Sequence, residues 1–394
     1  MREMAFRLVT ALSLLILAGQ PSHAQQRPRK SEGADALSAQ AEDARRSNRT
    51  VEAIGLYRKA LSTRPRWVEG WWHLATLLYD RDAYVEAAVA FRKAASLNPA
   101  VGTAWAMLGL CEVKLGQNDT ALVHLQRGRR LGTSADPQFR HVMLYQEGLL
   151  LLGKGEFERA QETLGLLSAD GVESEDLTIA LGLSVLRVPR ADLQQGESPD
   201  HELLGLAGRA EHLAAQRRFD EALSEYERLV AKFPVTRNVH YDIGRYFVAR
   251  TQPERAVAAF EREIEVSPDH VPARLGIAAI KAETDPAGAL SYAEEAVRLN
   301  PRIPLGHYLL GSLLLHTDQT ARAIAELETA ERSVHRDPAV YYALGRAYTK
   351  AGRPRDAENA RATFKRLTEE RQIAARREAA ASERRPDAAA SPPP

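Results

Sequence analysis

The feature that most constrains this chain is a spacing of small and large apolar residues that returns about every 34 residues. In residues 68–101 the spaced residues are Trp71, Leu74, Ala75, Ala87, Phe91, Ala94 and Pro99. A period of this length marks an array of short structural units, each of which is one supersecondary motif. We therefore expect a stacked array rather than a fold built around one central core.

The same residues predict two helices joined by a tight turn in each unit. The expected apolar faces are Trp71, Leu74, Leu77 and Leu78 on the first helix, and Ala87, Ala88, Phe91 and Ala94 on the second. Residues 80–84 supply the turn, and Pro99 ends the second helix. Ala75 is small, which allows the two helices to cross closely. One such hairpin cannot bury its apolar face alone, so it must stack on its neighbours.

Copies of this pattern, most of them degenerate, fill most of the chain. We predict them at residues 34–67, 68–101, 102–137, 139–170, 203–236, 237–268, 269–301, 304–338 and 338–370. Between the fourth and fifth copies, residues 176–188 form one expected helix that lacks a partner helix. The polar residues 189–200, which include two prolines, are interpreted as an irregular insertion or hinge. The array is thus expected to have an N-terminal lobe (34–170) and a C-terminal lobe (203–370), separated by residues 171–202.

Two segments flank the array. Residues 25–33 are polar and basic and are expected to be a flexible lead-in. Residues 371–394 combine the end of a charged helix, 365–385, with a Pro- and Ala-rich tail from Pro386. We expect the charged helix to cap the array and the tail to be disordered by its composition.

The pattern resembles the tetratricopeptide repeat. That family has an aromatic, Leu-Gly/Ala, aromatic, Ala, Phe/Tyr, Ala and Pro in the order filled here by Trp71, Leu74-Ala75, Leu78, Ala87, Phe91, Ala94 and Pro99. The resemblance covers residues 34–370 and implies an all-α, right-handed superhelical α-solenoid of about nine to ten helix-turn-helix repeats. It also implies a concave surface, lined by the first helices, that binds a peptide or helix.

Residues 1–24 have the features of a secretory signal peptide. A positive start at Arg2 and Arg7 precedes the apolar run 8–19 and the small-x-small sequence Ser22-His23-Ala24. The apolar run is too short to span a bilayer comfortably. Cleavage after Ala24 predicts a periplasmic or secreted protein, and retention of the segment as an N-terminal anchor is the alternative. Gln20 stands where a lipoprotein needs Cys, so no lipid attachment is expected.

The charge balance argues against two classes of partner. The whole chain has a formal net charge of +1, and residues 1–24 hold two basic residues and one acidic residue, so the cleaved chain would be neutral. Binding to nucleic acid needs a clustered basic excess, and so does binding to an anionic membrane surface. We therefore expect no nucleic-acid partner and no membrane anchor after signal cleavage.

No catalytic motif stands out. His201-Glu202 begins like a metalloprotease helix, but Gly205 stands where the second His is needed. The sequence has no Gly-rich phosphate loop and no GxSxG, and its eleven His residues lack metal-ligand spacing. It therefore predicts a non-enzymatic protein with no cofactor, no metal and no small-molecule substrate. The one cysteine, Cys111, cannot form an internal disulfide; its apolar neighbourhood predicts a packing role, and a reactive thiol is the alternative.

The candidate binding residues lie on the first helices. The residue after the Trp71 position, and those four and seven residues further on, are expected to face the concave surface. They are Trp72, Thr76 and Tyr79, with counterparts Tyr241 and Arg245, Tyr308 and Ser312, and Tyr342 and Arg346. Aromatic residues and Arg dominate interface energetics, so we interpret this set as a partner-binding groove. The alternative is that the rings pack against the first helix of the neighbouring repeat.

One binding mode of the family is not expected here. Its carboxylate clamp, which grips the C-termini of chaperones, uses Lys and Asn at defined first-helix positions. Trp72 and Thr76, Ala106 and Leu110, or Tyr241 and Arg245 occupy those positions in this chain. The departure argues against the binding of chaperone tails.

Together these features predict a non-enzymatic scaffold or adaptor of the cell envelope that binds a protein or peptide partner. Two alternatives stay open. One is a non-catalytic accessory subunit of an envelope protease or polysaccharide complex. The other is a structural oligomer held together through residues 365–385.

Overall fold

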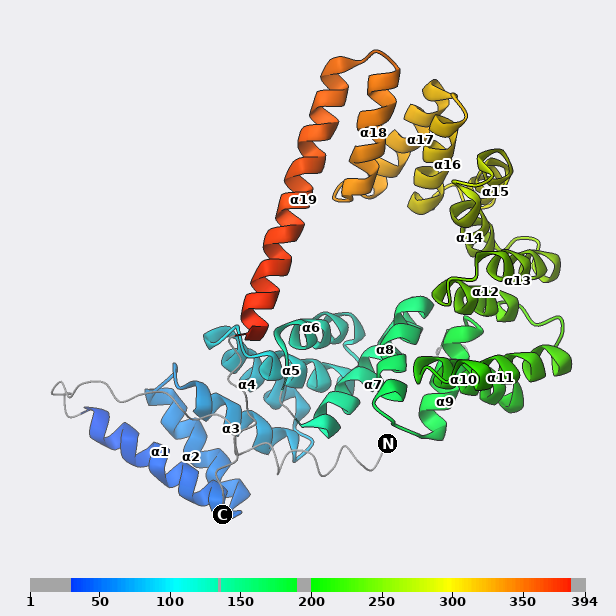
Figure 1. Ribbon diagram of the computed structural model, residues 1–394. Helices are drawn as coiled ribbons and strands as arrows, with labels where there is room; N and C mark the ends of the chain where they lie inside the picture. Colours follow the sequence, from blue (N-terminus) through cyan, green and yellow to red (C-terminus); the bar gives the residue numbers. More distant parts are fainter. Residues whose placement is uncertain (1–29, 134–135, 190–199, 384–394) are drawn as a thin grey trace. The chain divides into compact units, whose positions relative to one another are not determined.

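The computed structural model describes residues 30–133, 136–189 and 200–383, and all the regular elements in these ranges are α-helices (Figure 1). The expected all-α solenoid of helix-turn-helix repeats is confirmed. The predicted signal peptide, most of the 189–200 insertion and the tail from Pro386 lie outside the described ranges. Among the described helices, none combines the length and apolar character that a bilayer crossing requires.

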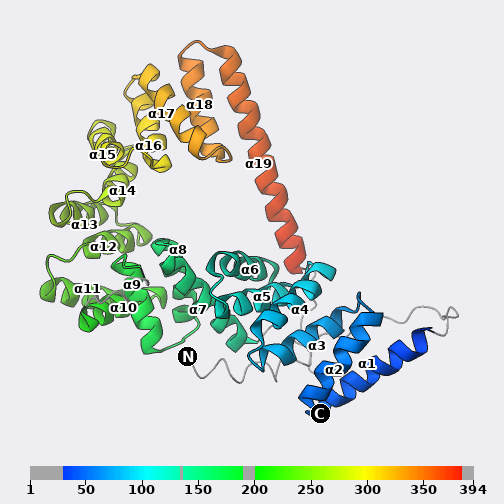
Figure 2. The same ribbon diagram turned by 180° about the vertical axis from the view of Figure 1, so that it is seen from behind.

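The chain divides into two compact units, which are described separately. Unit 1 is Met1–Ser184, Val188–His201 and Ala215–Arg217, and unit 2 is Val185–Arg187, Glu202–Ala214 and Arg218–Pro394. Unit 1 therefore contains α1 to α8 and nearly all of α9, whereas unit 2 contains most of α10 and all of α11 to α19. Consecutive helices pack side by side from α1 to α8 in unit 1 and from α12 to α19 in unit 2 (Figures 1 and 2).

The helices of unit 1 alternate between first and second helices of the repeats. They are α1 (Lys30–Arg46), α2 (Thr50–Thr63), α3 (Val68–Tyr79), α4 (Tyr84–Leu97), α5 (Gly102–Lys114), α6 (Asn118–Leu131), α7 (Pro137–Gly153), α8 (Phe157–Ala169) and α9 (Glu175–Val185). The first of them begins at Lys30, within the predicted lead-in of 25–33, of which residues 25–29 lie outside the described ranges. Lys and Glu are good helix formers, and each residue added to an existing helix gains a hydrogen bond at little cost.

Unit 2 continues the alternation. Its helices are α10 (His201–Ala215), α11 (Phe219–Lys232), α12 (Val239–Ala249), α13 (Pro253–Val266), α14 (Val271–Lys281), α15 (Pro286–Leu299), α16 (Pro304–His316), α17 (Thr320–Ser333), α18 (Pro338–Lys350) and α19 (Pro354–Glu383). The last helix runs past the predicted repeat end at residue 370, and its side chains from Arg371 to Arg376 are exposed.

A small residue at the Ala75 position lets the two helices of each hairpin cross in direct contact. Glycine fills this position at Gly109, Gly148, Gly244 and Gly311. A Cβ atom added to Gly311 would lie 2.6 Å from Leu327 Cγ and 3.1 Å from the carbonyl oxygen of Ala323. The first helix thus rests directly on the large residue at the Phe91 position of the second helix, with no room for another methyl group.

All the hairpin turns in the described residues, except that between α14 and α15, share one backbone conformation. Positive φ angles occur in these turns at Asn48, Asp82, Gly116, Gly155, Arg217, Thr251, Asp318 and Gly352. The following amide closes a six-to-one hydrogen bond, as from Ala83 N to Leu78 O (3.0 Å). This is the Schellman motif, which satisfies carbonyl groups at the end of the first helix. The predicted turn at residues 80–84 is confirmed, since α3 ends at Tyr79 and α4 begins at Tyr84.

A side-chain hydrogen bond braces the connection between successive hairpins. Trp71 Nε1 donates to the carbonyl oxygen of Pro65, and Trp105 Nε1 donates to that of Pro99, each at 3.0 Å. The Tyr341 hydroxyl makes the same contact with the carbonyl six residues earlier, that of His335, at 3.0 Å. Each bond ties a first helix to the turn before it and contributes about 0.5–1.5 kcal/mol.

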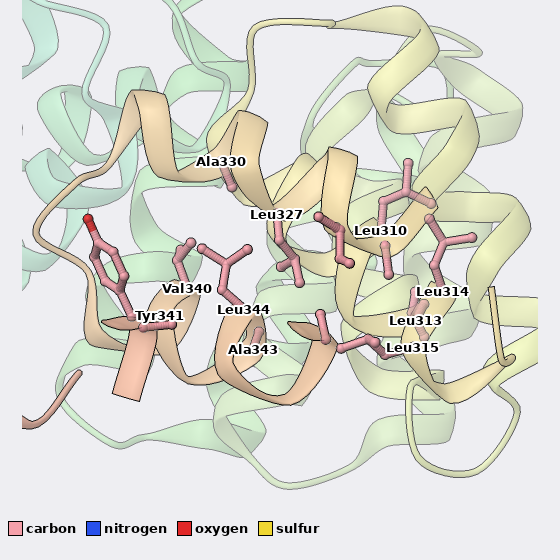
Figure 3. Close-up of a cluster of buried hydrophobic side chains, with 14 of the residues drawn as sticks. Leu310, Leu313, Leu314, Leu315, Leu327, Ala330, Val340, Tyr341, Ala343 and Leu344 are labelled. Atoms are coloured by element: carbon pink, nitrogen blue, oxygen red, sulfur yellow. The ribbon is translucent and has the colours of Figure 1, made fainter. Parts of the chain in front are cut away.

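Consecutive hairpins share their apolar cores. Figure 3 shows leucines of α16 facing Leu327 of α17, with Val340 and Leu344 of α18 beside them. Leu310, Leu314 and Leu327 are buried in this cluster, as are Tyr341 and Leu344. Because each hairpin completes the core of its neighbour, the stacking predicted from the repeat is what buries the apolar faces.

Thr251 allows a test of the turn geometry. It is an exposed β-branched residue with φ 56°, a conformation that costs such residues about 1–2 kcal/mol. Thr251→Gly relieves this strain at an entropic cost of about 0.5–1 kcal/mol, so we expect a small gain in stability. Thermal unfolding of the full chain should show a midpoint higher by about 1–3 °C.

The matched control is Gly352→Thr, which introduces the same strain at the equivalent turn, where φ is 67°. We expect this variant to melt at a lower temperature than the parent. A lower midpoint for Thr251→Gly, or an unchanged one for Gly352→Thr, would contradict the assigned turn geometry.

Candidate functional site

In the reference repeat, the three predicted groove residues are mostly occupied with packing. Trp72 is only 8% exposed, and its ring lies edge-on to Phe91 with centroids 5.4 Å apart. The Thr76 hydroxyl donates to the carbonyl oxygen of His73 at 2.9 Å. Tyr79 is half-buried against Tyr84, and burial raises its pKa. Trp72 therefore packs on the second helix of its own hairpin, not on the first helix of the neighbouring repeat, and it offers a partner little surface.

Tyr241 on α12 is half-buried and supported from several sides. Its ring centroid lies 4.8 Å from that of His270 and 5.7 Å from that of Phe260. The guanidinium carbon of Arg187 lies 5.5 Å from the Tyr241 ring centroid. The ring is therefore held in one orientation beside a cation, a geometry that favours stacking with a partner side chain.

Arg245, one turn after Tyr241, is held by a buried carboxylate. Its Nη1 lies 3.6 Å from Oδ1 of Asp242, a residue that is almost fully buried. The Tyr226 hydroxyl donates to Oδ2 of Asp242 at 2.5 Å and lies 3.4 Å from Glu211 Oε2. Burial raises the pKa of Tyr226 well above its usual value, so this phenol stays a donor. Through Asp242, this network positions the Arg245 guanidinium group.

The first repeat contains a related network. The Tyr57 hydroxyl, equivalent to that of Tyr226, donates to Glu42 Oε1 at 2.6 Å, and His73 Nε2 lies 3.7 Å from the same oxygen. Burial alone would raise the pKa of Glu42, but the Tyr57 hydroxyl, Arg45 and His73 outweigh it, and the pKa is lowered. A tyrosine at the Phe91 position thus organises a carboxylate at the first repeat of the array and again at α11.

A second buried carboxylate caps α12. Glu263 replaces the small Ala94-type residue and is fully buried. Its Oε1 accepts from the amide of Asn238 at 2.7 Å, and its Oε2 accepts from the amide of Tyr241 at 3.2 Å. These are amides that a helix N-terminus leaves unpaired, so the carboxylate fixes the start of the helix that carries Tyr241 and Arg245.

His270 joins α12 to α14 through both ring nitrogens. Its Nδ1 accepts from the amide of Ala273 at 3.0 Å, so Nε2 carries the proton and donates to Asn238 Oδ1 at 3.1 Å. The amide group of Asn238 also donates to the carbonyl oxygen of Leu186 at 2.8 Å. Burial, followed by the nearby cations Arg187 and Arg237, lowers the pKa of His270 to about 4.

The predicted residues on α16 and α18 differ in exposure. Tyr308 and Ser312 are half-buried, with Tyr308 packed against the core cluster of Figure 3. Tyr342 is 54% exposed, although its ring rests against Phe364 with centroids 5.6 Å apart. Arg346, one turn later, is exposed, and no ion pair to it is found in the described part of the chain.

Charged residues at apolar repeat positions were missed by the sequence reasoning. Glu112 and Glu147 are buried at the Leu78 and Leu74 positions and are paired with Arg92 (3.1 Å) and Arg129 (3.0 Å) of the preceding second helix. A carboxylate at a position that other copies fill with an apolar residue was the available signal. These pairs brace successive hairpins, so their role is structural.

The described residues contain no group of three or more His, Cys, Asp or Glu side chains placed to hold a metal ion. Cys111 is fully buried, and burial raises the pKa of its thiol to about 12, which confirms the packing role.

Stacked hairpins with a small residue at each helix crossing define an α-solenoid repeat protein. The family model described as the tetratricopeptide repeat matches residues 38–100, 208–271 and 274–338. Residues 38–100, 208–271 and 274–338 are therefore tetratricopeptide repeats. A comparison with curated proteins gives no significant match.

Several solved structures resemble parts of the chain. A crystal structure of MamA is 16% identical, covering 42% of this chain and 96% of that one with a TM-score of 0.39. MamA 41-end from Desulfovibrio magneticus RS-1 is 19% identical, covering 44% and 98% with a TM-score of 0.39. PilF of Pseudomonas aeruginosa is 17% identical, covering 58% and 91% with a TM-score of 0.38. At this level of similarity, nothing about partners follows from these proteins.

The position of His270 predicts a pH dependence of α14. The folded state keeps the imidazole neutral down to about pH 4, whereas the unfolded chain takes up its proton near pH 6.5. The contribution of this residue to stability is therefore complete above about pH 6.5 and is lost as the pH falls towards 4. Hydrogen exchange of residues 271–281, corrected for intrinsic rates, should show protection falling over this range.

The control is His270→Ala, which removes the titrating group and the bond to the Ala273 amide. We expect α14 to be less protected in this variant at pH 7, with a weaker dependence on pH. An identical pH dependence in the parent and the variant would contradict the assignment.

Proposed function

We propose that this protein is a scaffold that binds a peptide or a helix of a partner protein along the exposed faces of its first helices. Tetratricopeptide repeats serve protein–protein interaction, and this is the class of function that the family supports. The finer proposal concerns the surface used. It assigns the contacts to Tyr241 and Arg245 on α12, and to Tyr342 and Arg346 on α18.

The observation that carries the proposal is the supported aromatic–arginine pair. On both helices a tyrosine is followed by an arginine one turn later, and the tyrosine ring rests on a residue of the next helix, Phe260 or Phe364. Aromatic rings already held in place lose little entropy when a partner binds. The tyrosines offer stacking surface, and the guanidinium groups offer donors for carbonyl or carboxylate oxygens.

Other members of the predicted set have smaller roles in this proposal. Tyr79, Thr76, Tyr308 and Ser312 are half-buried and offer partial surface, whereas Trp72 supports the hairpin from inside. We place the binding energy in the two aromatic–arginine pairs, because interface energy concentrates in a few aromatic and Arg residues.

We also propose that the protein works in the cell envelope. The support is the signal-like sequence of residues 1–24, with its positive start, short apolar run and small-x-small end. Within this proposal the partner is an envelope protein. The same binding surface also suits an accessory subunit of an envelope enzyme complex.

The test begins with a photo-crosslinking residue at position 342 in the full chain, used in an envelope extract of the cells that produce it. The crosslinked segment of the partner is identified, synthesised and titrated against the purified protein. Tyr342→Ala with Arg346→Ala should weaken binding by about 10–100-fold, because each residue is expected to contribute more than about 1 kcal/mol. The melting temperature should stay within about 2 °C of the parent.

The matched control is Arg355→Ala with Asn359→Ala, two exposed residues of α19. This pair should leave the affinity unchanged. Unfolding of the Tyr342/Arg346 variant, or binding equal to that of the parent, would contradict the proposed surface.

A further inference from the structure

The second helices α2, α4 and α6 of unit 1 expose a regular set of valines. Val51 of α2 is 70% exposed, Val85 and Val89 of α4 are 65% and 51% exposed, and Val123 of α6 is 58% exposed. Val51 and Val85 occupy the same repeat position, and so do Val89 and Val123. Val is a poorer helix former than Ala, so exposed valines at these second-helix positions do not serve the stability of the helices.

Basic side chains follow the valines along the same helix faces. Lys59, Lys93 and Arg127 come one turn after the Val89 position in the three helices. No ion pair of Lys59, Lys93 or Arg130 is found among the residues the structure describes. Together α2, α4 and α6 hold seven basic and three acidic side chains, a net charge of +4.

In unit 2, the second helices of the first two hairpins are α11 and α13, and their net charge has the opposite sign. In α11 and α13, eight acidic and four basic side chains give a net charge of −4, with Glu263 the buried member. Asp220 and Glu254 are exposed at the repeat position that Val51 and Val85 occupy in unit 1. Over the described ranges, Asp220, Glu227 and Glu254 have no ion-pair partner.

We propose that the valine-lined basic face of α2, α4 and α6 in one copy of the protein docks on the acidic face of α11 and α13 in a second copy. The unpaired cations of the first face then meet the unpaired carboxylates of the second, and the valines lose contact with water. Reciprocal use of both faces closes a dimer, and successive use extends a chain of copies.

The overall charge favours a second copy as the occupant. The chain has a net charge of only +1, so two copies approach without long-range repulsion, while their faces of opposite sign attract. An anionic lipid surface suits this face less well, because Glu52, Glu86 and Asp119 lie in the first turns of the same helices.

The area of the smaller face sets the expected affinity between two copies. A 14-residue helix is about 21 Å long and about 10 Å wide, so the two helices of the acidic face cover roughly 400 Å². A contact of this size buries about 800 Å² in total, which is typical of weak, transient contacts. The expected dissociation constant is in the micromolar range, about 1–100 μM.

Sedimentation analysis of the full chain at about 5–200 μM tests the proposal. The average mass should rise with concentration, and it should fall when salt is raised from about 50 to 500 mM, because screening weakens the charge contacts. Lys59→Glu with Lys93→Glu should weaken association at least about tenfold, as should Asp220→Lys with Glu254→Lys. Combining all four substitutions should restore it.

The matched control is Arg302→Glu with Arg355→Glu, which makes the same charge change at exposed positions outside both faces and should leave association unchanged. Circular dichroism verifies that each variant is folded, since a lysine in the first turn costs a helix about 0.3–1 kcal/mol. A mass that stays monomeric at all concentrations overturns the proposal. Association that survives either charge reversal, or that fails to return in the fourfold variant, overturns it as well.

Discussion

The close crossing of the two helices in each hairpin is the contact on which the rest of the structure depends. At Gly244 a Cβ atom would lie 2.4 Å from Phe260 Cε1, so the first helix has no distance to spare. This contact sets the separation of the two helices and therefore the ridge on which the next hairpin stacks. Since every hairpin completes the core of its neighbour, an error at one crossing spreads along the array.

Polar side chains within this apolar packing hold the proposed binding residues in place. Glu263 fixes the start of α12 by accepting two amides, and Asp242, bound by the Tyr226 hydroxyl, lies beneath Arg245. A buried carboxylate is costly unless it is paired, and the partners of these two carboxylates are groups on α12 or on the helix before it. On α12 these polar contacts fix the helix that carries Tyr241 and Arg245.

Much of the fold followed from residue spacing, because the period, the small crossing residue and the turn each have a local cause. The turn between α3 and α4 at residues 80–84, and the end of α4 before Pro99, were predicted in this way. The candidate site was harder to predict from the sequence. Trp72 is buried because its ring turns onto Phe91, and residue spacing alone carries no information on the orientation of a side chain. The bonds of Glu263 and His270 join different helices, so they became visible only when the helices were placed.

The most direct test of this account is the thermal stability of a chain with Gly311→Leu, compared with Gly55→Leu. A side chain at Gly311 meets Leu327 at 2.6 Å, whereas a Cβ at Gly55 meets nothing within 4 Å. Overpacking at a crossing costs about 1–3 kcal/mol or more, and it should also reduce hydrogen-exchange protection in α16, α17 and the neighbouring α18. Gly55→Leu should leave unit 1 as stable as before or more so. Equal melting temperatures for the two variants would contradict the claim that the array depends on its close crossings.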